Sequence, residues 1–536
     1  MKYRVLLFLF ATLFVMNLFA KNYYVSATGN NTKDGLTPAN AWQTISKVNS
    51  SFASMAAGDS ILFKRGDVFF GSLIIGKSGT SALPITIDAY GTGAKPVISG
   101  FISVSPTSWV SVGNGIYQAL VPGAKASLNM VTINDVPQAL GRYPNITAPN
   151  GGYLNYETFS GYTSITDNEM DASTNWVGAE IVVRKNLWVL DRCLITAHSG
   201  GTFTFTNAER STNAGTAGFG YFIQNDPRTL DQFGEWYFNK TTKYLQVYFG
   251  TAAPSSYTIK ASGVDTLLYI GSKNYINVKN IAFDGSNADA ILGSSSSYVN
   301  IVNCDFTNSG SHAIDIGAVS NLVIDNCTTN RMLSNGFFIW NSKTSIVTIK
   351  NCSVKNVGYI PGMGYSDARA YKGIYAYVLS NLTMEGNRVD TIGCVAMEFQ
   401  GSNVLVKNNV VNYFDFIKDD GGGIYSYASG TDANPGPTFT NRVVSNNIVM
   451  NGIGAPYGRN NSTLYASGIY LDGRTMNVSI LNNTVFNNGK NGIHLNNPNN
   501  IIIRGNTSYN NLNAMSVMRW STIGVLGPLT ISNNIF

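Results

Sequence analysis

The sequence predicts an all-β fold built as a parallel β-helix. Three observations predict it: the composition, a recurring asparagine and pairs of short alternating segments. Of the 536 residues, 44% are hydrophobic and only 12% are charged, and 54 glycines stand against 16 prolines. Glycine and asparagine accept the positive φ of tight turns, so this composition is typical of a turn-rich β protein with enough apolar residues to fill a core.

The first twenty residues, 1–20, predict a secretory signal peptide. Lys2 and Arg4 precede an apolar run that ends at the small residue Ala20. A run of about 16 apolar residues at the N-terminus is too short to favour a membrane span, and no later segment is apolar enough for one. We therefore expect a protein of a bacterium or a similar cell that is secreted or held at the cell surface, with no membrane span.

Charge and cysteine content restrict the partners. The formal net charge is +6, and the basic residues are not gathered into a run, so we expect no nucleic-acid partner. Five cysteines are an odd number and form no disulfide framework of the small secreted type. We expect a monomer with no cofactor, except that one alternative below would use Ca²⁺.

A recurring asparagine marks the repeat. It follows an apolar-x-apolar-x pattern, with a base step of 22 or 23 residues and occasional longer steps, in the series Asn280, Asn303, Asn326, Asn351, Asn387, Asn409, Asn447, Asn483, Asn506 and Asn534. Such a period predicts a solenoid with one coil per repeat. Each coil contains two short alternating segments, which predict strands. We expect the asparagines to stack as a ladder at one corner, and Cys304, Cys327 and Cys352 to form an internal column.

The coils resemble the right-handed parallel β-helix superfamily of secreted carbohydrate-active proteins, which includes pectate-lyase-like and polygalacturonase-like enzymes. The segments YYVSATGNNTKDGLTPANAWQTISKVN, GDSILFKRGDVF and PITIDAYGTGAKPVISG resemble the capping start of secreted bacterial β-helix enzymes. The resemblance implies a right-handed solenoid, with an N-terminal cap and first coil at 21–105 and further coils at 258–536. The chain ends shortly after Asn534 without a polar cap, which predicts a fragment of a longer protein.

Residues 106–257 lack the asparagine period and carry longer β-like segments such as EIVVRKNLWVLD. We interpret them as an inserted β-rich subdomain, similar to insertions in glycoside hydrolases of this superfamily. Arg142, Glu235 and Trp236 are candidates to reach over a substrate groove, although a structural role is favoured for all three.

The first strands of the later coils predict a binding face. We align GFFIWN (336–341), GIYAYV (373–378), CVAMEF (394–399), GIYSYA (423–428), GIYLDG (468–473) and GIHLNN (492–497), whose second and fourth residues are apolar and belong to the core. The third and fifth residues form two outward columns rich in aromatic side chains, which indicate a sugar-binding surface unless they pack beneath loops. The predicted substrate-binding residues are Trp340, Lys372, Tyr375, Tyr377, Tyr425, Tyr427, Tyr470, Arg474 and His494.

Three carboxylates on this face are candidates for catalysis. The alignment puts Glu398 and Asp472 at one position two coils apart, so we expect their α-carbons about 9 to 10 Å apart. Asp420 ends a loop near the intervening coil. Polysaccharide hydrolysis uses two carboxyl groups, one protonated as the acid and one acting as base or nucleophile. Glu398, Asp420 and Asp472 therefore predict a glycoside hydrolase.

Two alternatives stay open on the residues alone. A polysaccharide lyase or uronate epimerase would use Lys372, Arg459 or Arg474 as base, with Ca²⁺ held by Asp419, Asp420 and Asp472, in the way that the resemblance to β-helix lyases implies. A surface protein that only binds glycans is the second alternative. The residues do not identify the sugar.

Overall fold

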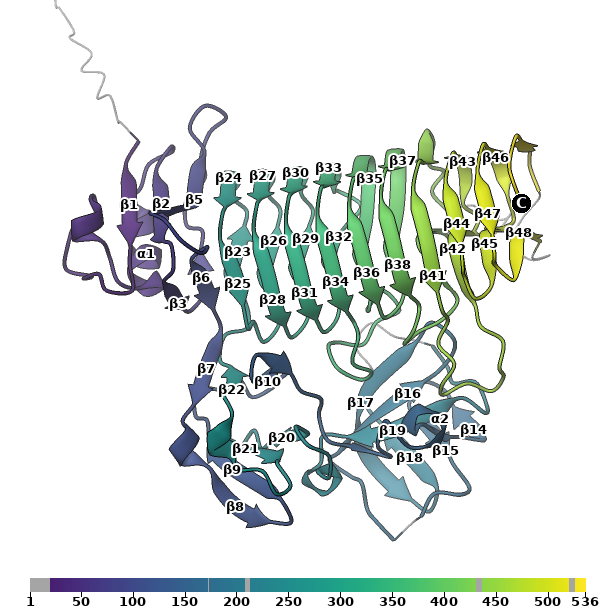
Figure 1. Cartoon of the computed structure of the whole chain (residues 1–536), viewed down its shortest axis with the longest axis horizontal. Helices are drawn as coiled ribbons and strands as arrows, with labels where there is room; N and C mark the ends of the chain where they lie inside the picture. The colour runs from purple at the N-terminus through teal and green to yellow at the C-terminus, as the bar shows by residue number, and fades with distance from the viewer. Residues whose placement is uncertain (1–19, 172, 208–212, 430–435, 520–525) are drawn as a thin grey trace, which may run out of the picture.

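The computed structural model describes residues 20–171, 173–207, 213–429, 436–519 and 526–536, so the predicted signal peptide lies outside the described residues except for Ala20. Figure 1 shows a long stack of strands with a second β-rich body beside it. Within the described ranges, no helix is both long and apolar enough to cross a membrane.

A small cap begins the stack. Strands β1 (Asn22–Val25), β2 (Ser60–Lys64) and β5 (Ile85–Tyr90) pair in parallel, and helix α1 (Ile45–Ser51) packs beside them. The Thr44 side chain accepts a hydrogen bond from the backbone N–H of Lys47, which caps the first turn of α1. Ile45 and Val48 of this helix join the main core.

The solenoid has three faces, which we number I to III in the order of the chain within a coil, starting from the eleven-stranded sheet. Face I consists of β3 (Val68–Phe70), β6 (Val97–Ser99), β25 (Ala282–Asp284), β28 (Asp305–Ser309), β31 (Thr328–Met332), β34 (Ser353–Val357), β36 (Arg388–Ile392), β38 (Val410–Phe414), β41 (Ile448–Gly452), β44 (Thr484–Phe486) and β47 (Thr507–Tyr509).

Faces II and III share one 22-stranded sheet, because β35 (Ile374–Glu385) and β37 (Met397–Lys407) run through the corner between them. Face II contains the first parts of these two strands with β4 (Leu73–Ile74), β23 (Leu268–Gly271), β26 (Ile291–Ser294), β29 (Ile314–Gly317), β32 (Phe337–Trp340), β39 (Gly421–Ala428), β42 (Ala466–Gly473), β45 (Asn491–Asn496) and β48 (Asn513–Met518). Face III contains the second parts with β1, β2, β5, β24 (Asn274–Lys279), β27 (Ser297–Val302), β30 (Ser320–Asp325), β33 (Ser345–Lys350), β40 (Arg442–Ser445), β43 (Met476–Leu481), β46 (Asn499–Arg504) and β49 (Leu529–Ser532).

The core is a set of apolar columns along the solenoid axis. All neighbouring strands of the three faces pair in parallel, so equivalent residues stack at the strand spacing of about 4.8 Å. One buried column of face II consists of Ile291, Ile314, Phe337, Ile374, Met397, Ile424, Ile469 and Ile493. The prediction of a parallel β-helix is confirmed, with Ile469 and Leu471 inside as expected.

The asparagine series in fact combines two neighbouring columns at the corner between faces III and I. Asn280, Asn303, Asn326 and Asn351 have left-handed φ and lie toward solvent. The six asparagines from Asn387 to Asn534 lie one position later in their coils than these four do. They continue the column formed by Cys304, Cys327 and Cys352. The expectation of a single ladder is therefore wrong by one residue for its first four members, whereas the buried cysteine column is confirmed.

The inner column forms a hydrogen-bonded ladder. Asn409 is fully buried, and its Nδ2 donates to Asn447 Oδ1 at 2.9 Å and to the Met384 carbonyl at 3.0 Å. Its Oδ1 accepts the backbone N–H of Asn387 at 2.9 Å. Each amide thus satisfies polar groups of the coils on both sides, which the interior would otherwise leave unpaired.

The inserted body contains three antiparallel sheets. The first consists of β7 (Phe101–Val104), β10 (Val131–Ile133), β11 (Val136–Pro137) and β22 (Ile259–Ser262), and the second of β8 (Val110–Gly113), β9 (Ile116–Leu120), β20 (Trp236–Phe238) and β21 (Tyr244–Tyr248). The third, near helix α2 (Pro149–Gly152), consists of β12 (Arg142–Tyr143), β13 (Leu154–Asn155), β14 (Thr158–Ser160), β15 (Ser164–Thr166), β16 (Glu180–Arg184), β17 (Leu190–Ser199), β18 (Thr202–Phe205) and β19 (Gly220–Gln224).

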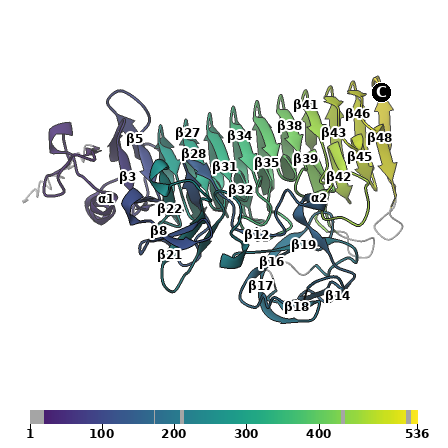
Figure 2. The same cartoon turned by 60° about the horizontal axis from the view of Figure 1, so that its bottom comes forward.

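The subdomain and three loops beside it leave the solenoid at one corner, between faces I and II. The subdomain lies between β6 and β23, and three loops follow β34, β38 and β41 at the same corner of later coils. The loops meet the third sheet of the subdomain, where Arg184 Nη1 donates to the Tyr457 carbonyl at 2.6 Å and the Asp419 N–H donates to the Leu187 carbonyl at 2.8 Å. The start of face II is therefore covered by the subdomain and these loops together (Figure 2).

The ladder gives a stability prediction. Asn409→Ala removes an amide and leaves buried N–H and C=O groups unpaired, so we expect the free energy of unfolding to fall by about 1–3 kcal/mol. Urea denaturation followed by circular dichroism measures the change. Asn412→Ala, on the outer side of the same coil, is the control and should change it less. Equal effects of the two substitutions would contradict the role given to the ladder.

Candidate functional site

Face II carries two outward columns, but the structure changes their membership. Strand pairing joins Tyr375 to Glu398 and Glu398 to Tyr425, so Glu398 belongs to the first column. Gln400, paired with Tyr377, occupies the column of Asp472. The expected alignment of Glu398 with Asp472 is wrong because the segment 394–399 is displaced by two residues. A two-residue shift keeps the in–out alternation of a strand, and the apolar pattern does not detect it.

The first column is buried rather than exposed. Tyr375 is 7% exposed, Tyr470 4% and His494 7%, and Tyr425 of the same column packs against a cluster of subdomain and loop residues. The second column is more open, since Tyr427 is 46% exposed and Asp472 is half-buried. The expectation of a fully exposed aromatic surface is therefore wrong, and the alternative of tyrosines packed beneath loops holds for the first column.

Two of the predicted catalytic carboxylates lie close together beside Tyr470. Burial, and then the negative charges of Asp420 and Asp472, raise the pKa of Tyr470. Charges that act on one phenol in this way lie near it, so Tyr470 has both carboxylates as neighbours. Asp420 comes from the loop before β39, whereas Tyr470 and Asp472 lie on β42, so the loop and the next coil together build the pair.

The two carboxyl groups have different surroundings. Burial, followed by the negative charge of Asp472, raises the pKa of Asp420 to about 7. Asp472 instead accepts hydrogen bonds from Tyr425 Oη at 2.7 Å and from Asn496 Nδ2 at 2.7 Å. The site thus holds a carboxyl group with a raised pKa beside a carboxylate that two side chains bond.

Asn496 is a site residue that sequence reasoning left among the column members without a role. Its Nδ2 also donates to the Tyr470 hydroxyl at 2.8 Å, so it orients both Tyr470 and Asp472. The signal available in the sequence was its position, one coil after Asp472 in the aligned segments.

The third carboxylate, Glu398, forms a buried ion pair with Lys372. Both side chains are less than one tenth exposed, and the Lys372 ammonium lies 5.2 Å from the Tyr375 ring centroid and 5.8 Å from that of Tyr425. Such a cation between two aromatic faces is held in place by the rings as well as by the carboxylate. Glu398 therefore neighbours the Asp420–Asp472 pair through Tyr425 instead of facing it directly.

The remaining predicted residues are distributed around this centre. Burial lowers the pKa of His494 to about 4, so its imidazole, 4.6 Å from the Tyr470 ring centroid, is neutral at ordinary pH. Arg474 is half-buried and its backbone N–H bonds the Ala428 carbonyl. Trp340 lies further toward the N-terminal coils, where its Nε1 donates to Asp315 Oδ1 at 2.6 Å.

The calcium ligands of the lyase alternative do not come together. Asp419 is completely buried in an ion pair with Arg459, and its second oxygen accepts the backbone N–H of Tyr465 at 3.0 Å. This carboxylate and this guanidinium neutralise each other inside the loop packing. Asp419 is thus committed to a structural contact, and so is Arg459 as a candidate base.

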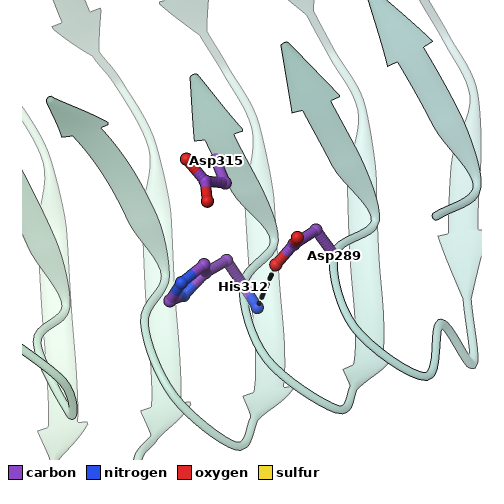
Figure 3. A group of neighbouring side chains, drawn as sticks. All are labelled: Asp289, His312 and Asp315. Carbon is purple, nitrogen blue, oxygen red and sulfur yellow. Dashed lines mark hydrogen bonds between the residues drawn. The ribbon is translucent and has the colours of Figure 1, made fainter. Parts of the chain in front are cut away.

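A different group has the spacing of a metal site. Asp289, His312 and Asp315 on face II place one potential ligand atom each within 4.8 Å of one another (Figure 3). However, His312 Nδ1 accepts the backbone N–H of Asn335 at 3.2 Å, so the neutral imidazole carries its proton on Nε2 and has no lone pair for a metal there. His312 N–H also donates to Asp289 Oδ1 at 3.2 Å. These donors fit a hydrogen-bonded cluster better than a metal centre.

The three subdomain candidates do not reach over the site. Trp236 is 1% exposed in the subdomain core, and Glu235 accepts three backbone N–H bonds, from Arg142, Asp231 and Gln232. The Arg142 guanidinium lies 3.6 Å from the Phe222 ring centroid and donates to the Gly152 carbonyl at 2.5 Å. All three hold the subdomain together, which agrees with the favoured structural role.

Comparisons with known proteins support the fold. A family model described as a right-handed β-helix region matches residues 258–371. A solved structure described as a glycoside hydrolase is 14% identical with a TM-score of 0.67, covering 94% of this chain and 97% of that one. The complex of XylC with xylose is 14% identical with a TM-score of 0.52, covering 91% of this chain and 75% of that one. No curated protein sequence matches the chain.

A third solved structure is less similar. The GH136 lacto-N-biosidase from Eubacterium ramulus covers 96% of this chain and 67% of its own, with 12% identity and a TM-score of 0.36. At these identities the comparisons establish a shared right-handed parallel β-helix, as the sequence predicted. The reaction has to be inferred from the residues of the site.

The buried ion pair gives a second stability prediction. Lys372→Met leaves the Glu398 carboxylate buried without its cation, which costs about 3–5 kcal/mol of folding free energy. The double variant Lys372→Met/Glu398→Gln removes both charges and should recover part of that loss. Lys407→Met, which breaks an exposed pair with Glu385, is the control and should cost about 1 kcal/mol or less. Thermal unfolding of the four proteins checks this order, and a double variant less stable than Lys372→Met would contradict it.

Proposed function

We propose that the chain is a secreted carbohydrate-active enzyme and, more specifically, a glycoside hydrolase that cleaves a polysaccharide or oligosaccharide at Asp420 and Asp472. The observation that carries the proposal is a pair of carboxyl groups in different surroundings. Burial and the charge of Asp472 raise the pKa of Asp420 to about 7, and Asp472 accepts hydrogen bonds from two side chains. Glycoside hydrolysis requires this combination of an acid and a second carboxylate. The fold shared with a solved structure described as a glycoside hydrolase supports the same class, and the fold shared with XylC, solved with xylose, supports a carbohydrate ligand.

Each carboxyl group has a role that follows from its environment. Asp420, protonated below about pH 7, donates its proton to the glycosidic oxygen as the bond to the anomeric carbon breaks. Asp472, held by Tyr425 and Asn496, either takes a proton from the attacking water or attacks the anomeric carbon itself.

The proton balance closes through the solvent. In the course in which water attacks directly, Asp472 gains the proton that Asp420 has lost. Asp472 then releases its proton to water, and Asp420 takes one up from water. The products are the two sugar fragments and a site restored to its starting protonation.

Glu398 and Lys372 act as positioning residues in this scheme. Their ion pair packs the ammonium against the Tyr425 ring, and the hydroxyl of Tyr425 bonds Asp472. An elimination reaction has less support, since Lys372 and Arg459, two of its three candidate bases, are committed to buried ion pairs.

Substitution of the pair tests the proposal. Asp420→Asn and Asp472→Asn should each lower kcat by about 10²- to 10⁴-fold with the fold unchanged, since each removes a proton-transfer group. Asp325→Asn, on face III, is the matched control and should retain activity. The assay incubates the full chain with plant, algal and host glycans and measures new reducing ends. An unsaturated uronate product, detected by ultraviolet absorbance, would favour a lyase, and retention of a glycan without any product would favour a binding protein.

The raised pKa of Asp420 predicts the pH profile. The acid must be protonated, so kcat/KM should be highest below about pH 7 and fall as pH rises through that value. Initial rates across a pH series measure this limb. A rate that keeps rising well above pH 7 would exclude Asp420 as the general acid.

A further inference from the structure

A hollow lies on face III, away from the Asp420–Asp472 pair. It has a volume of about 330 Å³ and is lined by Ser81, Pro84, Tyr275, Asn277, Tyr298 and Asn300. Ligand sites occupy roughly 300–1,000 Å³, so this one has room for a single small ring. None of the six lining side chains carries a charge at neutral pH.

The two tyrosines occupy an unusual backbone position. Tyr275 has φ 57° and Tyr298 φ 58°, a left-handed conformation that bulky side chains rarely adopt. Asparagine is better suited to a left-handed φ, and it occupies the equivalent position in most later coils. These residues are Asn321, Asn381, Asn403, Asn441, Asn477 and Asn500, and Ile346 is the exception. A strained residue that the fold does not need points to another use of its side chain.

The rings form a flat, partly exposed platform. Tyr275 and Tyr298 stack with their centroids 4.5 Å apart and their planes 4° from parallel. Tyr298 is 45% exposed. The equivalent residue of the next coil is Asn321, so the stack has only these two members and is not continued by a third ring. An aromatic platform open to solvent suits the C–H face of a sugar ring, since both surfaces are apolar and flat.

Polar groups and a fixed wall complete the hollow. Asn300 Nδ2 donates to Asn277 Oδ1 at 2.8 Å, which sets the orientation of both amides beside the rings. The wall that contains Ser81 and Pro84 is held on β24, because the Gly79 N–H donates to the Asn274 carbonyl at 2.9 Å and the Asn274 N–H to Ser78 Oγ at 3.1 Å. Oriented amides next to an aromatic surface are groups that bond sugar hydroxyls.

We propose that this hollow is a non-catalytic binding site for one sugar unit of a neutral polysaccharide. The identification of the ligand as a sugar rests on the proposed function, whereas the geometry of the hollow is independent of it. The absence of charge among its lining residues favours a neutral glycan over a polyuronate. Lying on face III, it would hold a chain to the enzyme while face II cleaves it.

The test uses Tyr298→Asn, because asparagine is the residue that most later coils place at this position and should keep the fold. The full chain runs in native gels cast with xylan, barley β-glucan or galactomannan, and in gels with polygalacturonate or alginate. We expect the unmodified protein to be retarded by at least one neutral polymer, and Tyr298→Asn to bind it about 3- to 10-fold more weakly. Tyr509→Asn, which removes an exposed tyrosine stacked on Phe486 at face I, should bind as the unmodified protein does.

The outcomes separate this proposal from the catalytic one. All proteins also carry Asp420→Asn in a parallel series, so that hydrolysis during the gel does not affect retardation. Weaker binding by Tyr298→Asn supports the site even if no glycan is cleaved. The proposal is overturned if no neutral polymer retards the protein, if Tyr298→Asn and Tyr509→Asn bind alike, or if polyuronates bind best.

Discussion

The structure depends on the buried polar column at the corner between faces III and I. There the thiols of Cys304 to Cys352 give way to the amides of Asn387 to Asn534, each bonded to the next coil. Because every amide must meet its neighbour, each coil has to return to this corner in the same register. Extra residues cannot be placed there without leaving buried N–H and C=O groups unpaired.

Additional length therefore leaves at the other two corners. The subdomain and the loops after β34, β38 and β41 depart between faces I and II, so they gather above the first residues of the face II strands. This gathering makes the site. It buries Asp420 beside Asp472, and this burial raises the pKa of Asp420 to about 7, while Tyr425 and Asn496 donate hydrogen bonds to Asp472. The stacking of the coils thus gives the two carboxyl groups different surroundings.

The errors in the sequence interpretation have a common physical origin. The first four asparagines were assigned one residue away from the buried column, because both corner positions accept asparagine, one for its left-handed φ and the other for its amide bonds. Glu398 was placed two residues away from its true partners, because a shift of two preserves the alternation that defines a strand face. A local sequence pattern shows which side of a strand a residue faces, but it does not show which residue of the neighbouring coil it pairs with.

The sequence by itself determined the solenoid, its period, the apolar columns and the presence of an inserted β-rich segment, since each follows from patterns within one coil. It also singled out Asp420 and Asp472. Only the tertiary structure decided that these two lie close enough for the charge of one to raise the pKa of the other. It also decided that Glu398 pairs with Lys372 and Asp419 with Arg459, and that the aromatic column is buried. These contacts join a loop, a neighbouring coil or the subdomain. Their distances depend on how separate segments pack, which no repeat within a single coil encodes.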